Sequence, residues 1–162
     1  MNTPIVALIG QPNVGKSSFF NILAGKRSAI VSAKAGVTRD RQFSKIHLDD
    51  VPLWLVDTAG LSRHQDKLSS AMYEQSRMAA AQADLVILMT DGSSMCQAED
   101  IELARFIQKS KTKTILAINK HDLADPADIE TYKKMGMKES ISISCSNKFG
   151  IEEIKSAILQ HI

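Results

Sequence analysis

Eight consecutive residues near the beginning of the chain have the types and spacing of a phosphate-binding loop. Gly10 to Ser17 read G-Q-P-N-V-G-K-S and fit the pattern G-x-x-x-x-G-K-S. The two glycines let the backbone curl, so that successive N–H groups point inward and can hold phosphate oxygens. Lys16 would place its charge on the β- and γ-phosphates, and the Ser17 hydroxyl would bind Mg²⁺. The loop predicts nucleotide binding, with a plain strand-to-helix turn as the alternative. The candidate contacts in and beside it are Gly10, Asn13, Val14, Gly15, Lys16, Ser17 and Ser18.

A second polar motif indicates which base the nucleotide carries. Asn119-Lys120-His121-Asp122 follows an apolar run over 114–118. The Asp122 carboxylate can accept two hydrogen bonds from the N1–H and exocyclic amine of guanine, whereas adenine would present an acceptor to it. Ser144-Cys145-Ser146 follows the next apolar run, where a second base-contacting loop would lie. The motif alone could be a solvated polar turn, but after a phosphate-binding loop it favours guanine.

Two further segments could respond to the γ-phosphate. Asp57-Thr58-Ala59-Gly60 ends an apolar run, where Asp57 can hold Mg²⁺ through water and the Gly60 N–H can reach the γ-phosphate. Thr38, in the long polar stretch 27–41, offers a second hydroxyl for Mg²⁺ and the γ-phosphate. Either segment alone would be an ordinary polar loop. Together with the other motifs they are candidate switch segments, ordered by the triphosphate and released by hydrolysis.

These motifs need a scaffold, and the chain alternates short apolar runs, typical of buried strands, with longer amphipathic segments, typical of helices. The predicted strands are 5–9, 42–48, 51–56, 85–89, 114–118 and 140–143. The predicted helices are 16–24, 69–82, 98–109, 127–135 and 151–161. Asp49-Asp50 predicts a tight hairpin turn, and Asp125-Pro126 predicts the start of a helix. The pattern predicts an α/β fold of three layers, in which a mostly parallel six-stranded sheet with one antiparallel edge strand has helices on both faces.

Composition excludes several classes of protein. The 162 residues are 44% hydrophobic and 23% charged, which suits one globular domain and not a disordered chain. A formal net charge of +2 is too balanced for a dedicated nucleic-acid-binding domain, so any RNA contact would come from a local patch. Lys109, Lys111 and Lys113 form a candidate basic edge, although such an edge usually faces solvent.

The two cysteines, Cys96 and Cys145, are far apart in the chain, which argues against a disulfide framework or a zinc site. We therefore expect a reducing, cytoplasmic compartment. The apolar run 5–9 is too short to span a bilayer, and no membrane partner is expected.

The motifs together resemble the Era and EngA/Der group of GTPases over almost the whole chain. The likeness is greatest to the first GTPase domain of the EngA/Der family, and it rests on segments 10–17, 36–41, 74–76, 83–84 and 135–137. The resemblance implies a P-loop GTPase fold, Mg²⁺-dependent hydrolysis of GTP to GDP, and a role in assembly of the large ribosomal subunit. It also implies that Asp122 binds guanine, that Lys120 packs on the base, and that the Cys145 amide reaches the guanine oxygen. Alanine is usual at the Cys145 position, but a backbone contact should tolerate a small side chain.

One position departs from Ras-like enzymes, because Leu61 follows Gly60 where they have a glutamine that orients the attacking water. The resemblance suggests that Asn13 and the Thr38 loop hold K⁺, which would offset charge on the transferring phosphoryl group. The candidate catalytic residues are Lys16, Thr38, Gly60 and Asn13. A loop-shaping turn at Asn13 is the alternative, and Arg39 or Arg41 could instead supply the charge.

Other functions stay open at this point. The domain could be a GTP-binding interaction module that hydrolyses slowly, or the G domain of a tRNA-modification GTPase of the MnmE type. A nucleoside or metabolite kinase sharing the phosphate loop is disfavoured by Asn119 and Asp122. The resemblance implies that residues 1–162 are one G domain excised from a longer protein, monomeric when isolated. Contacts with the large subunit and its rRNA would then lie mostly in the missing domains.

Overall fold

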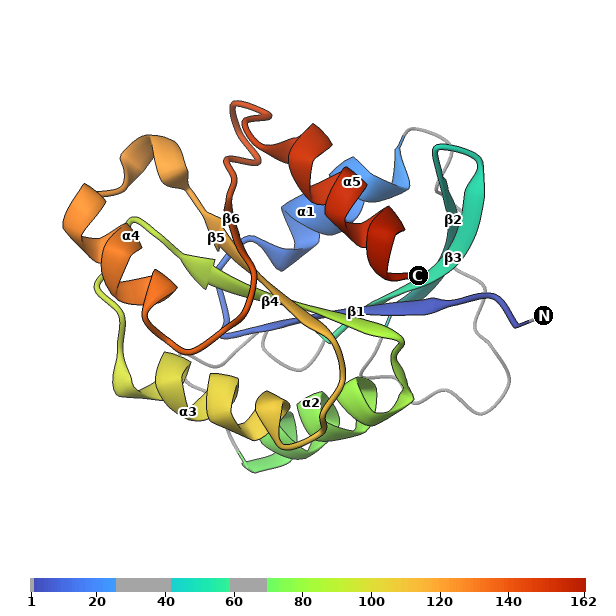
Figure 1. Cartoon of the computed structure of the whole chain (residues 1–162), viewed down its shortest axis with the longest axis horizontal. Coiled ribbons are helices and arrows are strands. Elements are labelled where there is room, and N and C mark those ends of the chain that lie inside the picture. The colour runs from blue at the N-terminus through green and yellow to red at the C-terminus, as the bar shows by residue number, and fades with distance from the viewer. Residues whose placement is uncertain (1, 26–41, 59–69) are drawn as a thin grey trace.

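The computed structural model describes residues 2–25, 42–58 and 70–162 of the chain. In these ranges one sheet of six strands has the order β2-β3-β1-β4-β5-β6 (Figure 1). The strands are β1 (Ile5–Gly10), β2 (Gln42–Leu48), β3 (Val51–Asp57), β4 (Leu85–Asp91), β5 (Thr114–Asn119) and β6 (Ser140–Ser142). The helices are α1 (Lys16–Ala24), α2 (Ser70–Gln82), α3 (Ala98–Gln108), the short η2 (His121–Leu123), α4 (Pro126–Lys133) and α5 (Ile151–His161). Only β2 runs antiparallel to its neighbour, at the edge of the sheet, so the predicted α/β fold is confirmed.

The hairpin between β2 and β3 has the predicted tight turn. Leu48 pairs with Val51, so only Asp49 and Asp50 lie in the loop. Both have positive φ angles, 47° and 67°, as a type I′ turn requires, and aspartate tolerates this conformation better than most residues. The turn fixes the register of the antiparallel pair.

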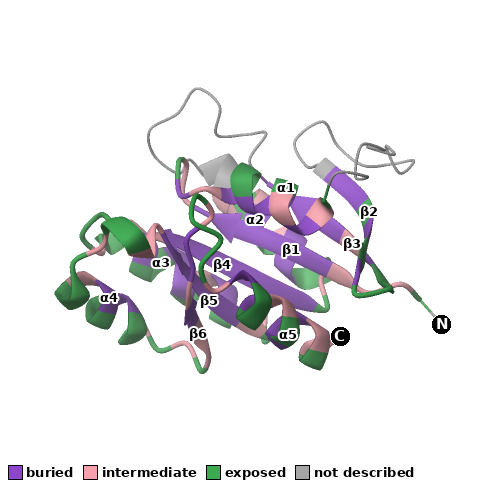
Figure 2. Ribbon diagram, turned by 90° about the horizontal axis from the view of Figure 1, so that it is seen from above, coloured by how far each residue is buried: buried purple, intermediate pink, exposed green. Residues whose placement is uncertain are grey.

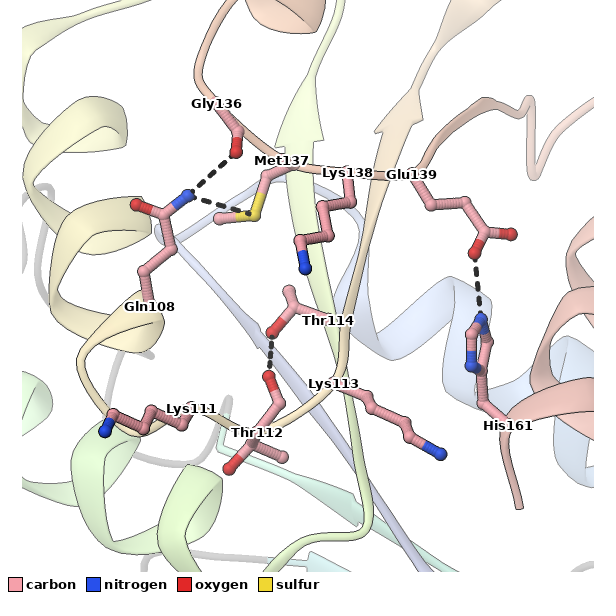
Figure 3. A pocket seen from close by; sticks show the side chains of 10 residues that line it. All are labelled: Gln108, Lys111, Thr112, Lys113, Thr114, Gly136, Met137, Lys138, Glu139 and His161. Carbon is pink, nitrogen blue, oxygen red and sulfur yellow. Dashed lines mark hydrogen bonds and ion pairs between the residues drawn. The ribbon is translucent and has the colours of Figure 1, made fainter.

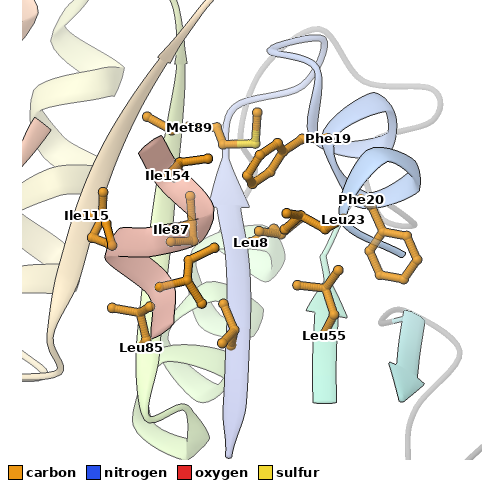
Figure 4. Packing of buried hydrophobic residues seen from close by; sticks show 14 of the residues in the cluster. Leu8, Phe19, Phe20, Leu23, Leu55, Leu85, Ile87, Met89, Ile115 and Ile154 are labelled. Carbon is orange, nitrogen blue, oxygen red and sulfur yellow. The ribbon is translucent and has the colours of Figure 1, made fainter. Parts of the chain in front are cut away.

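The sheet is buried on both faces, which is why its central strands are continuous apolar runs (Figure 2). Along β1, Val6 and Leu8 belong to one core, and Ala7 and Ile9 belong to the other. The first core packs α1 and α5 against the sheet, as Figure 4 shows for Phe19, Leu23 and Ile154 beside Leu8 and Ile87. The second core packs α2, α3 and α4 on the opposite face, through Ala79, Ala80, Leu103, Ala104, Ile107, Ile129 and Tyr132. The three layers therefore hold the strand ends in fixed positions.

The helices and strands predicted from the sequence are present, but some of them end at other residues than predicted. Strand β6 stops at Ser142, one residue before the predicted end at Ile143. The Asp125 side chain caps α4 as predicted, accepting a hydrogen bond from the Ala127 amide at 2.9 Å. That helix ends at Lys133, two residues early, and Gly136 follows with a φ of 89°. Among the described residues, no helix has the length and apolarity needed to cross a bilayer.

Candidate nucleotide-binding site

The predicted site residues that the structure describes lie at one edge of the sheet. Gly10, Asp57, Asp91 and Asn119 are the last residues of β1, β3, β4 and β5, and these strands are parallel. The carboxyl ends of parallel strands meet at one edge, and ligands of open α/β sheets bind there. Thr38, Arg39, Arg41, Gly60 and Leu61 lie outside the described residues.

The phosphate-binding loop joins β1 to α1 in a conformation that demands its glycines. Gly15 has a φ of 101° and Asn13 a φ of 67°, both in the left-handed region. A Cβ on Gly10 would lie 2.5 Å from the Met89 carbonyl oxygen, and a Cβ on Gly15 would overlap the side-chain nitrogen of Asn119. The loop is thus packed against β4 and β5, which holds its curled shape in place.

Lys16 is buried in this loop, with 4% of the residue exposed. Its ammonium group donates to the carbonyl oxygens of Gly10, at 2.6 Å, and Gln11, at 2.8 Å. Burial lowers the pKa of Lys16 to about 8, and the nearby Asp57 carboxylate opposes part of that shift. An anionic phosphate at the loop would stabilise the charged form, so the loop suits a ligand that is strongly negative.

Asp57 and Ser17 supply the oxygen atoms that Mg²⁺ prefers. Asp57 is 2% exposed at the end of β3, and Ser17 is exposed in the first turn of α1. The described residues contain no cluster of three His, Cys, Asp or Glu side chains that could hold a metal. Magnesium is usually held by one or two protein oxygens together with substrate phosphates, and Asp57 and Ser17 are oxygen donors of this kind. Thr58 donates to the Leu8 carbonyl oxygen at 3.2 Å, which anchors the end of β3 to β1.

Asn119 connects the phosphate-binding loop to the last loop of the site. It is 3% exposed, and its Nδ2 donates to the Val14 carbonyl oxygen at 3.0 Å. Its Oδ1 accepts from the Cys145 amide at 3.2 Å. The sequence placed Asn119 in the base motif, and the structure gives it the further task of holding two loops together.

The carboxylate of Asp122 is exposed and braced from behind. The hydroxyl of Ser144, a fully buried residue, donates to Asp122 Oδ1 at 2.9 Å and lies 3.2 Å from the Ser146 hydroxyl oxygen. The Cys145 side chain is half-buried, and burial raises the pKa of its thiol to about 11, although the hydrogen bond with Asn119 opposes this. The thiol is therefore neutral near pH 7, and the Cys145 backbone is held in place by Asn119.

Sequence reasoning missed the acidic partner of Lys120. The Lys120 ammonium group lies 3.0 Å from Asp91 Oδ2 and 3.3 Å from the Asn13 carbonyl oxygen. Asp91 also accepts from the Ser93 amide at 2.9 Å. Burial alone would raise the pKa of Asp91, but the hydrogen bonds from Ser93 and Lys120 hold it below its usual value. The sequence did carry one sign of this role, because Asp91 ends an apolar run just as Asp57 does.

Asp100 is a second supporting residue that the sequence did not reveal. It is 6% exposed and accepts from Gln11 Nε2 at 2.6 Å and from the Gln97 amide at 3.0 Å. The second bond is part of the capping box of α3. Burial is the main reason that the pKa of Asp100 is raised. Through Gln11 the phosphate-binding loop is tied to the start of α3.

Comparisons with known proteins agree with this geometry. A family model described as "50S ribosome-binding GTPase" matches residues 5–120. GTPase Der of Stenotrophomonas maltophilia is 35% identical over 161 residues, which are 98% of this chain and 35% of that protein. GTPase Der of Ruminiclostridium cellulolyticum is 37% identical over 164 residues, covering 99% of this chain and 37% of that protein. The chain spans about a third of the length of these relatives.

Solved structures show the same architecture. An Aquifex aeolicus Era variant bound to GDP and AlF₄⁻ superposes with a TM-score of 0.76 at 28% identity, covering 100% of this chain and 57% of Era. The G domain of the T. maritima FeoB iron transporter has a TM-score of 0.74 at 31% identity, with 99% of both chains covered. Era in complex with MgGDPNP and a segment of 16S ribosomal RNA has a TM-score of 0.73 at 26% identity, covering 99% of this chain and 57% of that one.

Proposed function

Because this chain belongs to the family of 50S ribosome-binding GTPases, we propose that it is the GTP-hydrolysing switch domain of a protein that assembles the large ribosomal subunit. The observation that carries the proposal is the position of Asn119, which joins the phosphate-binding loop at Val14 to the base loop at Cys145. One nucleotide can therefore contact both loops. Two GTPase Der proteins match 98% and 99% of the chain, so a tRNA-modification GTPase is not favoured.

The phosphate-binding loop would hold the β- and γ-phosphates through its backbone N–H groups. Lys16 would transfer its hydrogen bonds from the carbonyls of Gly10 and Gln11 to phosphate oxygens. The charge of Lys16 would then offset the negative charge that develops on the transferring phosphoryl group. The residues assigned to the phosphates are Gly10, Asn13, Val14, Gly15, Lys16, Ser17 and Ser18.

The oxygens of Ser17 and Thr38, with Asp57 through water, would hold Mg²⁺. When bound, Mg²⁺ would offset the negative charge of the phosphate oxygens. Ser17 lies in the first turn of α1 and Asp57 ends β3, so both are fixed by regular structure. Gly60 would donate its N–H to the γ-phosphate, and loss of that phosphate would release the segments that contain Thr38 and Gly60.

Guanine would be bound by Asp122, with the Lys120 side chain packed on the base and the Cys145 amide on the guanine oxygen. Ser144 already orients Asp122, while Asp91 and Asn13 hold the Lys120 ammonium group. Ser146 would support the same loop. This arrangement rejects adenine, because adenine would leave the Asp122 carboxylate without donors.

A K⁺ ion at Asn13 would offset the negative charge on the transferring phosphoryl group, in a chain where Leu61 cannot orient the attacking water as a glutamine would. Support comes from the position of Asn13, which is exposed in the phosphate-binding loop with a φ of 67°. Single-turnover hydrolysis measured in KCl and in NaCl tests this assignment. Equal rates in the two salts would rule it out and leave Arg39 or Arg41 as the candidate source of charge.

Titration of the chain with GDP, GTP and ADP by calorimetry tests the central proposal. We expect both guanine nucleotides to bind and ADP to bind much more weakly. Binding of ADP with equal affinity would favour a kinase instead. A second measurement, hydrolysis with and without large ribosomal particles, tests the switch. A rate that neither K⁺ nor the particles change would favour a GTP-binding interaction module that hydrolyses slowly.

A further inference from the structure

A pocket of about 420 Å³ lies away from the nucleotide-binding edge (Figure 3). It is formed where α3 ends and β5 begins, where α4 leads into β6, and where α5 ends. The residues that line it are Gln108, Lys111, Thr112, Lys113, Thr114, Gly136, Met137, Lys138, Glu139 and His161. Its volume is in the range of small-ligand sites in proteins.

The pocket lies at the opposite end of the sheet from the phosphates. Thr114 is the first residue of β5, and Asn119, at the nucleotide edge, is the last. Five steps along the strand, at about 3.3 Å each, separate these two residues by roughly 17 Å. A ligand here would not compete with GTP for space.

Hydrogen bonds fix the walls of the pocket. Gln108 Nε2 donates to the Gly136 carbonyl oxygen at 3.0 Å, joining α3 to the loop before β6. Thr112 donates to the Ala80 carbonyl oxygen at 2.7 Å, and Thr114 donates to the Thr112 carbonyl oxygen at 3.0 Å. The pocket is thus preformed, and the side-chain oxygen of Gln108 and the threonine hydroxyl oxygens keep acceptor capacity for a ligand.

Most of the charged side chains around the pocket are positive. Lys111, Lys113 and Lys138 are exposed, and among the described residues their ammonium groups have no hydrogen bond or ion pair. The one acidic lining residue, Glu139, lies 2.9 Å from His161 Nε2. In Figure 3 the Lys138 side chain extends toward Thr114, and that of Lys113 toward His161. Three unpaired cations therefore lie at the rim of a pocket whose one carboxylate, Glu139, is held against His161.

We propose that this pocket binds single-stranded RNA, with one unpaired nucleotide inserted and its neighbouring phosphates on the three lysines. The Gln108 amide and the threonine hydroxyls can hydrogen-bond a base edge, and the Met137 thioether and threonine methyls can pack on its face. An acidic peptide would use the lysines but not the hydrogen-bonding groups and the thioether of the pocket. The inference goes beyond the GTPase function and does not depend on it, since the two sites are at opposite ends of the sheet.

Binding of a labelled single-stranded RNA of about 12 nucleotides, within usual site sizes, tests the proposal by fluorescence anisotropy. The pocket variant is Lys113→Gln with Lys138→Gln, and the matched control is Lys45→Gln with Lys155→Gln, which changes net charge equally. At about 50 mM salt we expect the pocket variant to lose about tenfold in affinity, and the slope of log affinity against log salt to shrink by about 1.4. The control should bind as the unmodified chain does.

Insertion of a base has its own measurement. A 2-aminopurine in the strand should brighten on binding, as it leaves the stack, and the pocket variant should remove that change. The same RNA in duplex form should bind more weakly. Equal losses in both variants, tighter binding of the duplex, no 2-aminopurine signal, or no RNA binding at all would each overturn the proposal.

The two proposals fail independently. Both double variants should keep the GTP affinity and hydrolysis rate of the unmodified chain. A chain that binds RNA at the pocket but not GTP would refute only the proposed GTPase function, and the converse would refute only the RNA site.

Discussion

The Asn119 side chain donates a hydrogen bond to the Val14 carbonyl oxygen across 3.0 Å, although 105 residues separate them in the chain. The same side chain accepts from the Cys145 amide. Replacing Asn119 with Ala would leave the Val14 carbonyl and the Cys145 amide without these partners. We expect Asn119→Ala to lower the free energy of unfolding by at least about 2 kcal/mol. Urea denaturation of the nucleotide-free chain measures this directly.

Asn119→Ala should also weaken GTP and GDP alike, since the loops that hold phosphates and base would separate. Asn147→Ala is the matched control, because Asn147 is exposed and, within the described part of the chain, only its backbone amide has a hydrogen bond, to the Ser144 hydroxyl oxygen. Unchanged stability in Asn119→Ala would show that the connection between the loops contributes little.

Asp122→Asn tests the base-binding residue. An amide side chain presents a donor where guanine also presents donors, so GTP affinity should fall at least about 100-fold. Xanthosine triphosphate has a carbonyl at that position and should bind the variant better than it binds the unmodified chain. Calorimetry with GTP and with xanthosine triphosphate measures this change in preference. Asp50→Asn, in the exposed hairpin turn, makes the same chemical change elsewhere and should alter neither affinity.

Gly15→Ala tests the packing of the phosphate-binding loop. A Cβ there would overlap Asn119, and the φ of 101° is strained for alanine. Gly25→Ala is the comparison, because Gly25 has a φ of 71° but no atom within 4 Å of the added carbon. Backbone strain alone costs about 1–3 kcal/mol in either variant. We expect Gly15→Ala to lower the free energy of unfolding by at least about 2 kcal/mol more than Gly25→Ala does. Equal losses in thermal or urea unfolding would show that the contact with Asn119 has no energetic weight.

Because the Cys145 thiol is partly buried, we expect the stability of the protein to depend on pH. Burial raises its pKa from 9.0 to about 11, so between these values the unfolded chain loses the proton first. Stability contributed by the neutral thiol is therefore present below pH 9 and is lost as the pH rises toward 11. In a Cys96→Ser background, iodoacetamide at pH 8 should modify Cys145 about 100-fold more slowly than an ordinary thiol, as intact mass would show. Alkylation at the ordinary rate would mean that the thiol is not buried.

Much of this molecule could be predicted from the sequence. The apolar runs predicted the central strands β1, β4 and β5, because a sheet covered on both faces requires buried side chains on both sides of these strands. Asp49-Asp50 and Asp125-Pro126 marked the turn and the helix start through local chemistry alone. The described motif residues then meet at the carboxyl edge, since strand direction determines where each motif lies.

Contacts between residues far apart in the chain could not be predicted from the sequence. Nothing in the order of residues shows that Asp91 pairs with Lys120, or that Asp100 holds Gln11, since each pair forms only when the loops meet. The three lysines of the pocket are likewise dispersed, with Lys138 separated from Lys111 and Lys113 by all of β5 and α4. Periodicity reports burial within one element, whereas these contacts depend on how separate elements pack.

The two edge strands of the sheet have features that disfavour pairing with strands of other protein chains. Strand β6 has only three residues, and the other edge strand, β2, carries the exposed side chains of Lys45 and His47. A short strand offers few unpaired amides and carbonyls, and a charged one is costly to bury against another strand. Neither edge is therefore a good template for strand addition. The sheet that presents the nucleotide site is in this way protected against edge-to-edge aggregation.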